Sequence, residues 1–114
     1  MNNIVYELKE GKGFVKEYDD YFGNLIFKGE YLNGKRNGKG KEYDYDGRLE
    51  FDGEYLNKKR NGKGKEFYSD GNLFFEGQYL YNFKRKGKEY YFNGKLKYEG
   101  EYLFDNKYNG KMEY

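Results

Sequence analysis

Phe51-Asp52-Gly53-Glu54-Tyr55-Leu56 is one copy of a phrase that returns along the whole chain. The other copies are Phe27-Lys28-Gly29-Glu30-Tyr31-Leu32, Phe75-Glu76-Gly77-Gln78-Tyr79-Leu80 and Tyr98-Glu99-Gly100-Glu101-Tyr102-Leu103. Their central glycines stand at residues 29, 53, 77 and 100, a period of about 24 residues. Because a fixed period of this size is the signature of a repeat array, the repeat decides the fold.

Each copy has the alternation of a β-strand. Around Gly53, the residues Leu49, Phe51 and Tyr55 share one parity, and acidic residues occupy the other. Two-residue hairpin signals recur between the copies, because Asp-Gly and Asn-Gly pairs favour type I′ turns. They are Asp46-Gly47, Asp70-Gly71 and Asn93-Gly94. The sequence therefore predicts an all-β fold: a single-layer antiparallel meander of stacked hairpins, elongated and twisted. About ten strands at ~4.8 Å each would extend roughly 40–45 Å.

The 114 residues are predicted to form one array over residues 1–114. Its units are expected at 11–37, 38–61, 62–85 and 86–109, with partial units at both ends. Gly11-Lys12-Gly13 opens an irregular first unit. The last segment, Gly110 to Tyr114, starts a further unit and indicates either a capping strand or a truncated array. The loop opposite the Asp-Gly turns, such as residues 33–38, is predicted to be longer and basic.

Glycine in mid-strand is costly unless something packs over it. We therefore predict that the repeated glycines leave room for aromatic rings of neighbouring strands, and a substitution such as Gly53→Val is expected to collide with those rings. These structural glycines are Gly29, Gly53, Gly77 and Gly100.

Composition excludes several classes of function. The chain has no Cys and no His, which removes thiolate nucleophiles, imidazole bases and the commonest metal ligands. The single serine, Ser69, stands beside a turn and has no base to activate it. Carboxylates recur in every unit, at Glu42, Glu54, Glu66 and Glu89, and are interpreted as solvated partners of Lys41, Lys65 and Lys88. The sequence thus predicts a protein that is not an enzyme, with no cofactor and no metal.

The repeated residues resemble the MORN repeat (membrane occupation and recognition nexus). The resemblance rests on residues 51–57 followed by Arg60-Asn61-Gly62-Lys63-Gly64, and it covers about Gly11 to Tyr114. Tyrosine stands where the family usually has tryptophan, and Asn37 and Asn61 stand where it often has histidine. The Asp-Gly-x-Leu turns are closer to the variant repeats of bacteria and protists. The resemblance implies an open sheet of hairpins and non-catalytic roles: scaffolding, dimerisation, binding of protein segments in a groove, and association with acidic phospholipids.

The recurring aromatic face is the first candidate site, because tyrosine offers rigid contact area with a polar tip. We predict a groove that binds a protein partner, or a second copy of the chain. The expected groove residues are Tyr31, Tyr43, Tyr45, Tyr55, Tyr79 and Tyr102.

Basic residues recur in the loops of every unit and form the second candidate site. They are Lys35, Arg36, Lys58, Lys59, Arg60, Lys84, Arg85 and Lys86. Such a row attracts acidic phospholipid headgroups, although lysines at a sheet edge also serve simply to prevent association.

Further alternatives remain open at this stage. An antitoxin-like inhibitory partner is implied by the resemblance to bacterial variant repeats, and arrays that bind carbohydrate or choline also use aromatic hairpins. Nucleic acid is disfavoured, because the net charge is only +2 and acidic residues flank the aromatics. The chain has no basic segment followed by an apolar run at its start and no transmembrane run, so it is expected in the cytoplasm, peripheral to a membrane if the lipid alternative holds.

Overall fold

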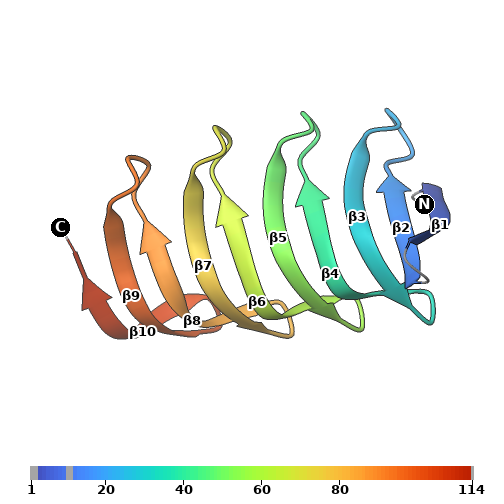
Figure 1. The fold of residues 1–114 in the computed structure, drawn as a ribbon. Helices are drawn as coiled ribbons and strands as arrows, with labels where there is room; N and C mark the ends of the chain where they lie inside the picture. The colour runs from blue at the N-terminus through green and yellow to red at the C-terminus, as the bar shows by residue number, and fades with distance from the viewer. Residues whose placement is uncertain (1–2, 10–11, 114) are drawn as a thin grey trace.

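The computed structural model describes residues 3–9 and 12–113, and these form one open antiparallel sheet (Figure 1). Ten strands follow one another in chain order, each paired with its neighbours in sequence. They are β1 (Asn3–Lys9), β2 (Lys12–Tyr18), β3 (Leu25–Leu32), β4 (Lys35–Tyr43), β5 (Leu49–Leu56), β6 (Lys59–Phe67), β7 (Leu73–Leu80), β8 (Phe83–Tyr90), β9 (Leu96–Leu103) and β10 (Asn106–Met112). The described residues contain no helix, and the predicted all-β meander is confirmed. Gly11 and Tyr114, at the ends of the expected array, lie outside the described residues.

The sheet is 45 Å long and 27 by 26 Å across. This length agrees with the expected stacking of about ten strands. Turns that lead from an even strand to the next odd strand lie along the upper edge in Figure 1. The expected two-residue turns at Asp46-Gly47 and Asp70-Gly71 are wrong: these turns span residues 44–48 and 68–72, and only the glycine of each pair has the positive φ that a type I′ turn needs at both residues. The lower edge carries the turns from odd to even strands.

These lower turns are shorter than the sequence predicts. Asn57 and Lys58, with φ of 49° and 75°, form a two-residue turn, and β6 begins directly after them at Lys59. The predicted longer basic loop is therefore wrong, because the left-handed conformation of two non-glycine residues closes the hairpin early. As a consequence, Arg60 belongs to a strand and its side chain points to one face of the sheet.

One face of the sheet holds the core, and we call it the aromatic face. Its fully buried members Phe27, Phe51 and Phe75 are joined by buried tyrosines of the same and neighbouring units. The Phe51 ring lies 5.6 Å from the Tyr55 ring and 5.3 Å from the Tyr79 ring, both edge-to-face. Because each phenylalanine bridges two units in this way, the rings form a continuous layer along the array.

Glycines at mid-strand make room for this layer. Gly53 faces Gly64 across the β5–β6 pair. A Cβ atom built on Gly53 would lie 2.6 Å from Phe51 Cζ, 2.6 Å from the Lys63 carbonyl oxygen and 2.7 Å from Gly64 Cα. The phenylalanine ring therefore folds down over a pair of glycines, and no larger residue fits at this position.

Candidate functional site

The aromatic face also contains charges, arranged in one cluster per unit. Strand register places Glu42 opposite Phe51, and Arg60 opposite Tyr55. Tyr55 Oη donates a hydrogen bond to Glu42 Oε2, and Arg60 Nε donates another to the same oxygen at 2.9 Å. The Arg60 guanidinium lies 4.1 Å from the centre of the Phe51 ring. We call this arrangement a tyrosine–glutamate–cation cluster.

The cluster is repeated along the array with small variations. In the first copy, Arg36 donates to Glu17 with two nitrogens, at 2.8 and 3.0 Å. In the later copies, lysine replaces arginine, and Lys84 Nζ lies 3.6 Å from Glu66 Oε2. The other clusters are Tyr31–Glu17–Arg36, Tyr79–Glu66–Lys84 and Tyr102–Glu89–Lys107.

These clusters fix the protonation of their members. Burial raises the pKa of Glu42, but the hydrogen bond and the charge of Arg60 outweigh burial and hold that pKa below its usual value. The pKa of Glu17 is lowered in the same way by Arg36. Burial and the Glu42 charge both raise the pKa of Tyr55. Glu17 and Glu42 are thus carboxylates and Tyr55 is a hydroxyl at neutral pH, which indicates a structural network and not a proton-transfer site.

We expect acid to unfold the protein through these carboxylates. Because their pKa values are lower in the folded chain than in the unfolded chain (about 4.3 for Glu), the stability they provide is fully present above that value. It is lost as pH falls through the folded values. The midpoint of thermal unfolding should therefore fall between pH 5 and pH 3, and Glu42→Gln should flatten that fall. An unchanged midpoint over this range would contradict the role of the clusters.

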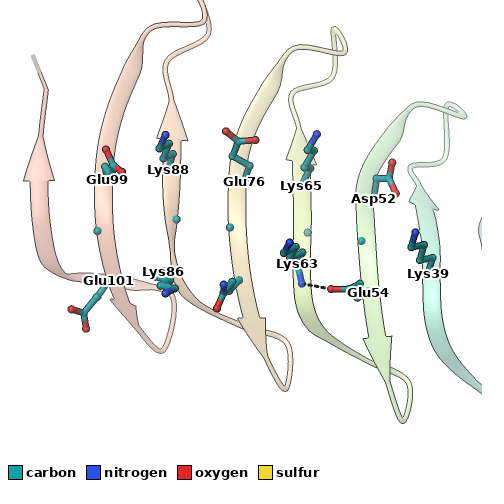
Figure 2. Close-up of a pocket in the computed structure, with 16 residues that line it drawn as sticks. Lys39, Asp52, Glu54, Lys63, Lys65, Glu76, Lys86, Lys88, Glu99 and Glu101 are labelled. Atoms are coloured by element: carbon teal, nitrogen blue, oxygen red, sulfur yellow. Dashed lines mark hydrogen bonds between the residues drawn. The ribbon is translucent and has the colours of Figure 1, made fainter.

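The opposite face of the sheet is hollowed, and we call it the charged trough. It encloses about 890 Å³ and runs across β4 to β9, over a floor that includes the backbone of the paired glycines. Figure 2 shows its charged side chains in rows on neighbouring strands. Its side chains are Lys39, Asp52, Glu54, Lys63, Lys65, Glu76, Gln78, Lys86, Lys88, Glu99 and Glu101.

The charges in the trough alternate in sign from strand to strand. Asp52 is paired in register with Lys65, and Lys65 with Glu76 (Figure 2). Even strands thus carry lysines, and odd strands carry carboxylates. The one interruption is Gln78, which lies between Lys63 and Lys86. Directly opposed charges of opposite sign stabilise a sheet. At Gln78 the two neighbouring lysines lack a carboxylate on the β7 side, although Lys86 is in register with Glu101 on its other side.

The structure does not bring the six expected groove tyrosines together. Tyr55, Tyr79 and Tyr102 are buried in the core of the aromatic face. Their row continues at Tyr31, which is half-buried. The remaining two are elsewhere: the Tyr43 ring lies on the other face, 5.9 Å from Lys28 Nζ, and Tyr45 stands in a turn with 73% of its surface exposed.

The eight expected basic residues divide in a similar way. Three of them, Arg36, Arg60 and Lys84, point to the aromatic face and hold its carboxylates. Lys86 belongs to the charged trough. The rest are exposed at the lower edge: Lys35, Lys58, Lys59 and Arg85.

The interpretation of the repeated carboxylates was partly wrong. Glu42, Glu66 and Glu89 do not pair with Lys41, Lys65 and Lys88, because adjacent residues in a strand point to opposite faces. The lysines are instead in register with carboxylates of the trough, as Lys41 is with Asp52. The sign alternation between strands was visible in the sequence and was the signal that could have revealed the trough.

No group of three or more acidic, histidine or cysteine side chains suited to a metal occurs within residues 3–9 and 12–113. Over the same residues, no helix is present that is long and apolar enough to cross a bilayer.

A family model described as the MORN repeat matches residues 27–47 and 51–73. The first match covers most of β3, all of β4 and most of the upper turn that follows, and the second covers most of β5, all of β6 and the next upper turn. Each match therefore coincides with one observed hairpin unit. No curated protein matches the chain. MORN repeats act in general as modules for interaction with proteins or membranes. The two matches and the ten-stranded meander identify this chain as a MORN repeat protein.

Proposed function

We propose that this chain is a non-catalytic interaction module in the cytoplasm that binds a segment of a protein partner along the charged trough. The observation that carries the proposal is the trough itself: a hollow of about 890 Å³ with rows of alternating charge. Electrostatic complementarity of this kind selects a partner and fixes its register more than it raises affinity. The side chains of the tyrosine–glutamate–cation clusters on the other face already bond to one another, so that few of their groups are left to contact a partner.

The partner's charges are expected to alternate with the same spacing as the strands, about 4.8 Å. Lys63 and Lys86, on either side of Gln78, are the best place for a partner's carboxylate, since no acidic residue lies between them in their row. An inhibitory, antitoxin-like role is one form that such binding would take. The same binding also fits a scaffold.

The test is affinity capture from the source cells with three forms of the chain, followed by mass spectrometry. The double variant Lys63→Gln/Lys86→Gln removes two trough charges next to an existing glutamine. Lys95→Gln, an exposed residue in an upper turn, is the matched control. We expect the wild type and the control to retain the same partner and the double variant to lose at least tenfold in its affinity for that purified partner. Equal affinity for all three forms would contradict the proposal.

Acidic phospholipid is the second candidate, and the exposed cations of the lower edge support it. Four exposed cations are distributed along the lower edge of the sheet: Lys35, Lys58, Lys59 and Arg85. It is the weaker candidate, because three of the eight expected cations are held by carboxylates of the aromatic face. Salt-sensitive sedimentation with phosphatidylserine vesicles, and none with phosphatidylcholine vesicles, is the result that would favour it.

A further inference from the structure

Two aromatic residues occupy a backbone conformation that bulky side chains rarely adopt. Tyr81 and Phe104, the first residues of the lower turns after β7 and β9, have φ of 48° and 49°. In the two preceding turns the same place holds Asn33 and Asn57, with φ of 52° and 49°. Asparagine tolerates this left-handed region well, whereas an aromatic residue there is strained.

Burial of these two side chains does not compensate for the strain, because both are exposed. Tyr81 is 53% exposed and Phe104 is 68% exposed. Strained residues persist where the surroundings hold them, and they are concentrated at functional sites. The surroundings do hold these turns: Tyr81 N donates to Asn61 Oδ1 at 3.1 Å, and Asn82 N donates to the Arg60 carbonyl at 2.9 Å.

The next turn is fastened to its neighbour in the same way. Lys84 N donates to Asp105 Oδ1 at 2.8 Å, so the turn that carries Phe104 is tied to the strand that follows Tyr81. Phe83 and Phe104 meet edge-to-face with ring centres 5.5 Å apart. The two turns and the strand ends beside them thus carry a group of exposed apolar side chains, which we call the loop patch: Leu80, Tyr81, Phe83, Leu103, Phe104 and Tyr108.

Positive charge borders the Tyr81 side of the loop patch, whereas the carboxylate of Asp105 lies in the turn beside Phe104. Lys59 Nζ lies 5.9 Å from the centre of the Tyr81 ring, and Arg85 is exposed next to Phe83 and Lys84 in β8. An apolar surface with a cationic border is complementary to an apolar stripe with acidic flanks. The two aromatic turns are two strands apart, about 9.6 Å at 4.8 Å per strand. This nearly equals the seven-residue repeat of an α-helix, about 10.5 Å.

We propose that the loop patch docks an amphipathic helix of a protein partner, with an apolar stripe on Tyr81 and Phe104 and acidic residues toward Lys59 and Arg85. A membrane is the less suitable occupant, because the lower turns after β3 and β5 present asparagine, glycine and lysine at the same level. The lower turns that the structure describes therefore do not form one continuous apolar plane. This site lies at the edge of the sheet, separate from the charged trough, and does not rest on it.

The test replaces Tyr81 and Phe104 by asparagine, the residue that the chain has at the same place in two other lower turns. In Tyr81→Asn/Phe104→Asn, both aromatics become asparagine, as in the lower turns after β3 and β5. Tyr45→Asn, at a tyrosine that is also exposed and lies in an upper turn, is the control. The probe is a fluorescent synthetic helix with leucine on one stripe and glutamate on its flanks, and a peptide with lysine in place of glutamate is its counterpart.

We expect the wild type and the control to bind the acidic helix, with the lysine peptide at least tenfold weaker by fluorescence anisotropy. The double asparagine variant should bind the acidic helix at least tenfold more weakly while its thermal midpoint stays equal or rises, since asparagine relieves strain. A lower midpoint by several degrees would show that the aromatics are structural and would overturn the proposal. Failure of the wild type to bind, unchanged binding by the variant, or a variant defect confined to phosphatidylserine vesicles would overturn it as well.

Discussion

Replacing Phe51 by alanine is expected to lower the free energy of unfolding by about 3–5 kcal/mol, the usual cost for a fully buried phenylalanine. Phe51 is 0% exposed and its ring contacts Tyr55 in its own unit and Tyr79 in the next. The Arg60 guanidinium rests on the same ring. The substitution therefore opens a cavity where two units meet, and it also removes the aromatic ring beneath a half-buried cation.

Denaturant unfolding followed by circular dichroism measures this loss. Phe92→Ala is the matched control, because Phe92 is 58% exposed at an upper turn, and it should change the free energy by less than about 1 kcal/mol. In an array whose units contact only their neighbours, loss of one interface also separates the two halves. We therefore expect Phe51→Ala to broaden the transition as well. Similar losses in the two variants would contradict the bridging role of Phe51.

The layout of the sheet could be predicted from the sequence because its determinants are local. The alternation around Gly53 predicts a strand, and Asp46-Gly47 predicts the turn before it. Because the same weak signals recur in every unit, together they predict one architecture for the array. One of the short lower turns carries the same kind of signal, because Asn33-Gly34 is an Asn-Gly pair with φ of 52° and 76°. Nothing in the equivalent Asn57-Lys58 indicates that both residues adopt positive φ.

That error explains the misplaced sites. When residues 57–62 are taken as one loop, Arg60 becomes a solvated cation, whereas the tight turn places it in β6 opposite Tyr55. Pairing between Glu42 and Arg60 depends on the register of three strands, which no local pattern specifies. The trough is different, because the sign alternation between odd and even strands is present in the sequence. To recognise the trough, one must also know which of the two alternating sets of strand residues faces away from the aromatic rings.

Replacing Arg60 by methionine is expected to cost about 2–3 kcal/mol, because Glu42 would keep its charge without its partner. Loss of one member of a buried ion pair typically costs about 3–5 kcal/mol. Because the Glu42 side chain is 21% exposed, water partly solvates its charge. We therefore expect a cost at or below the lower end of this range of about 3–5 kcal/mol. Methionine keeps the apolar stem over Phe51, so that the loss reports the charge and its hydrogen bond.

A double-mutant cycle with Glu42→Gln separates the pair from its surroundings. If Arg60 acts through Glu42, Arg60→Met in the glutamine background should cost at least about 1 kcal/mol less than in the wild type. Tyr55 still donates to the glutamine carbonyl, so its own contribution is retained in both backgrounds. Equal costs in the two backgrounds would show that Arg60 stabilises the sheet only by its position over Phe51, and the cluster would then be a cation–aromatic contact and not an ion pair.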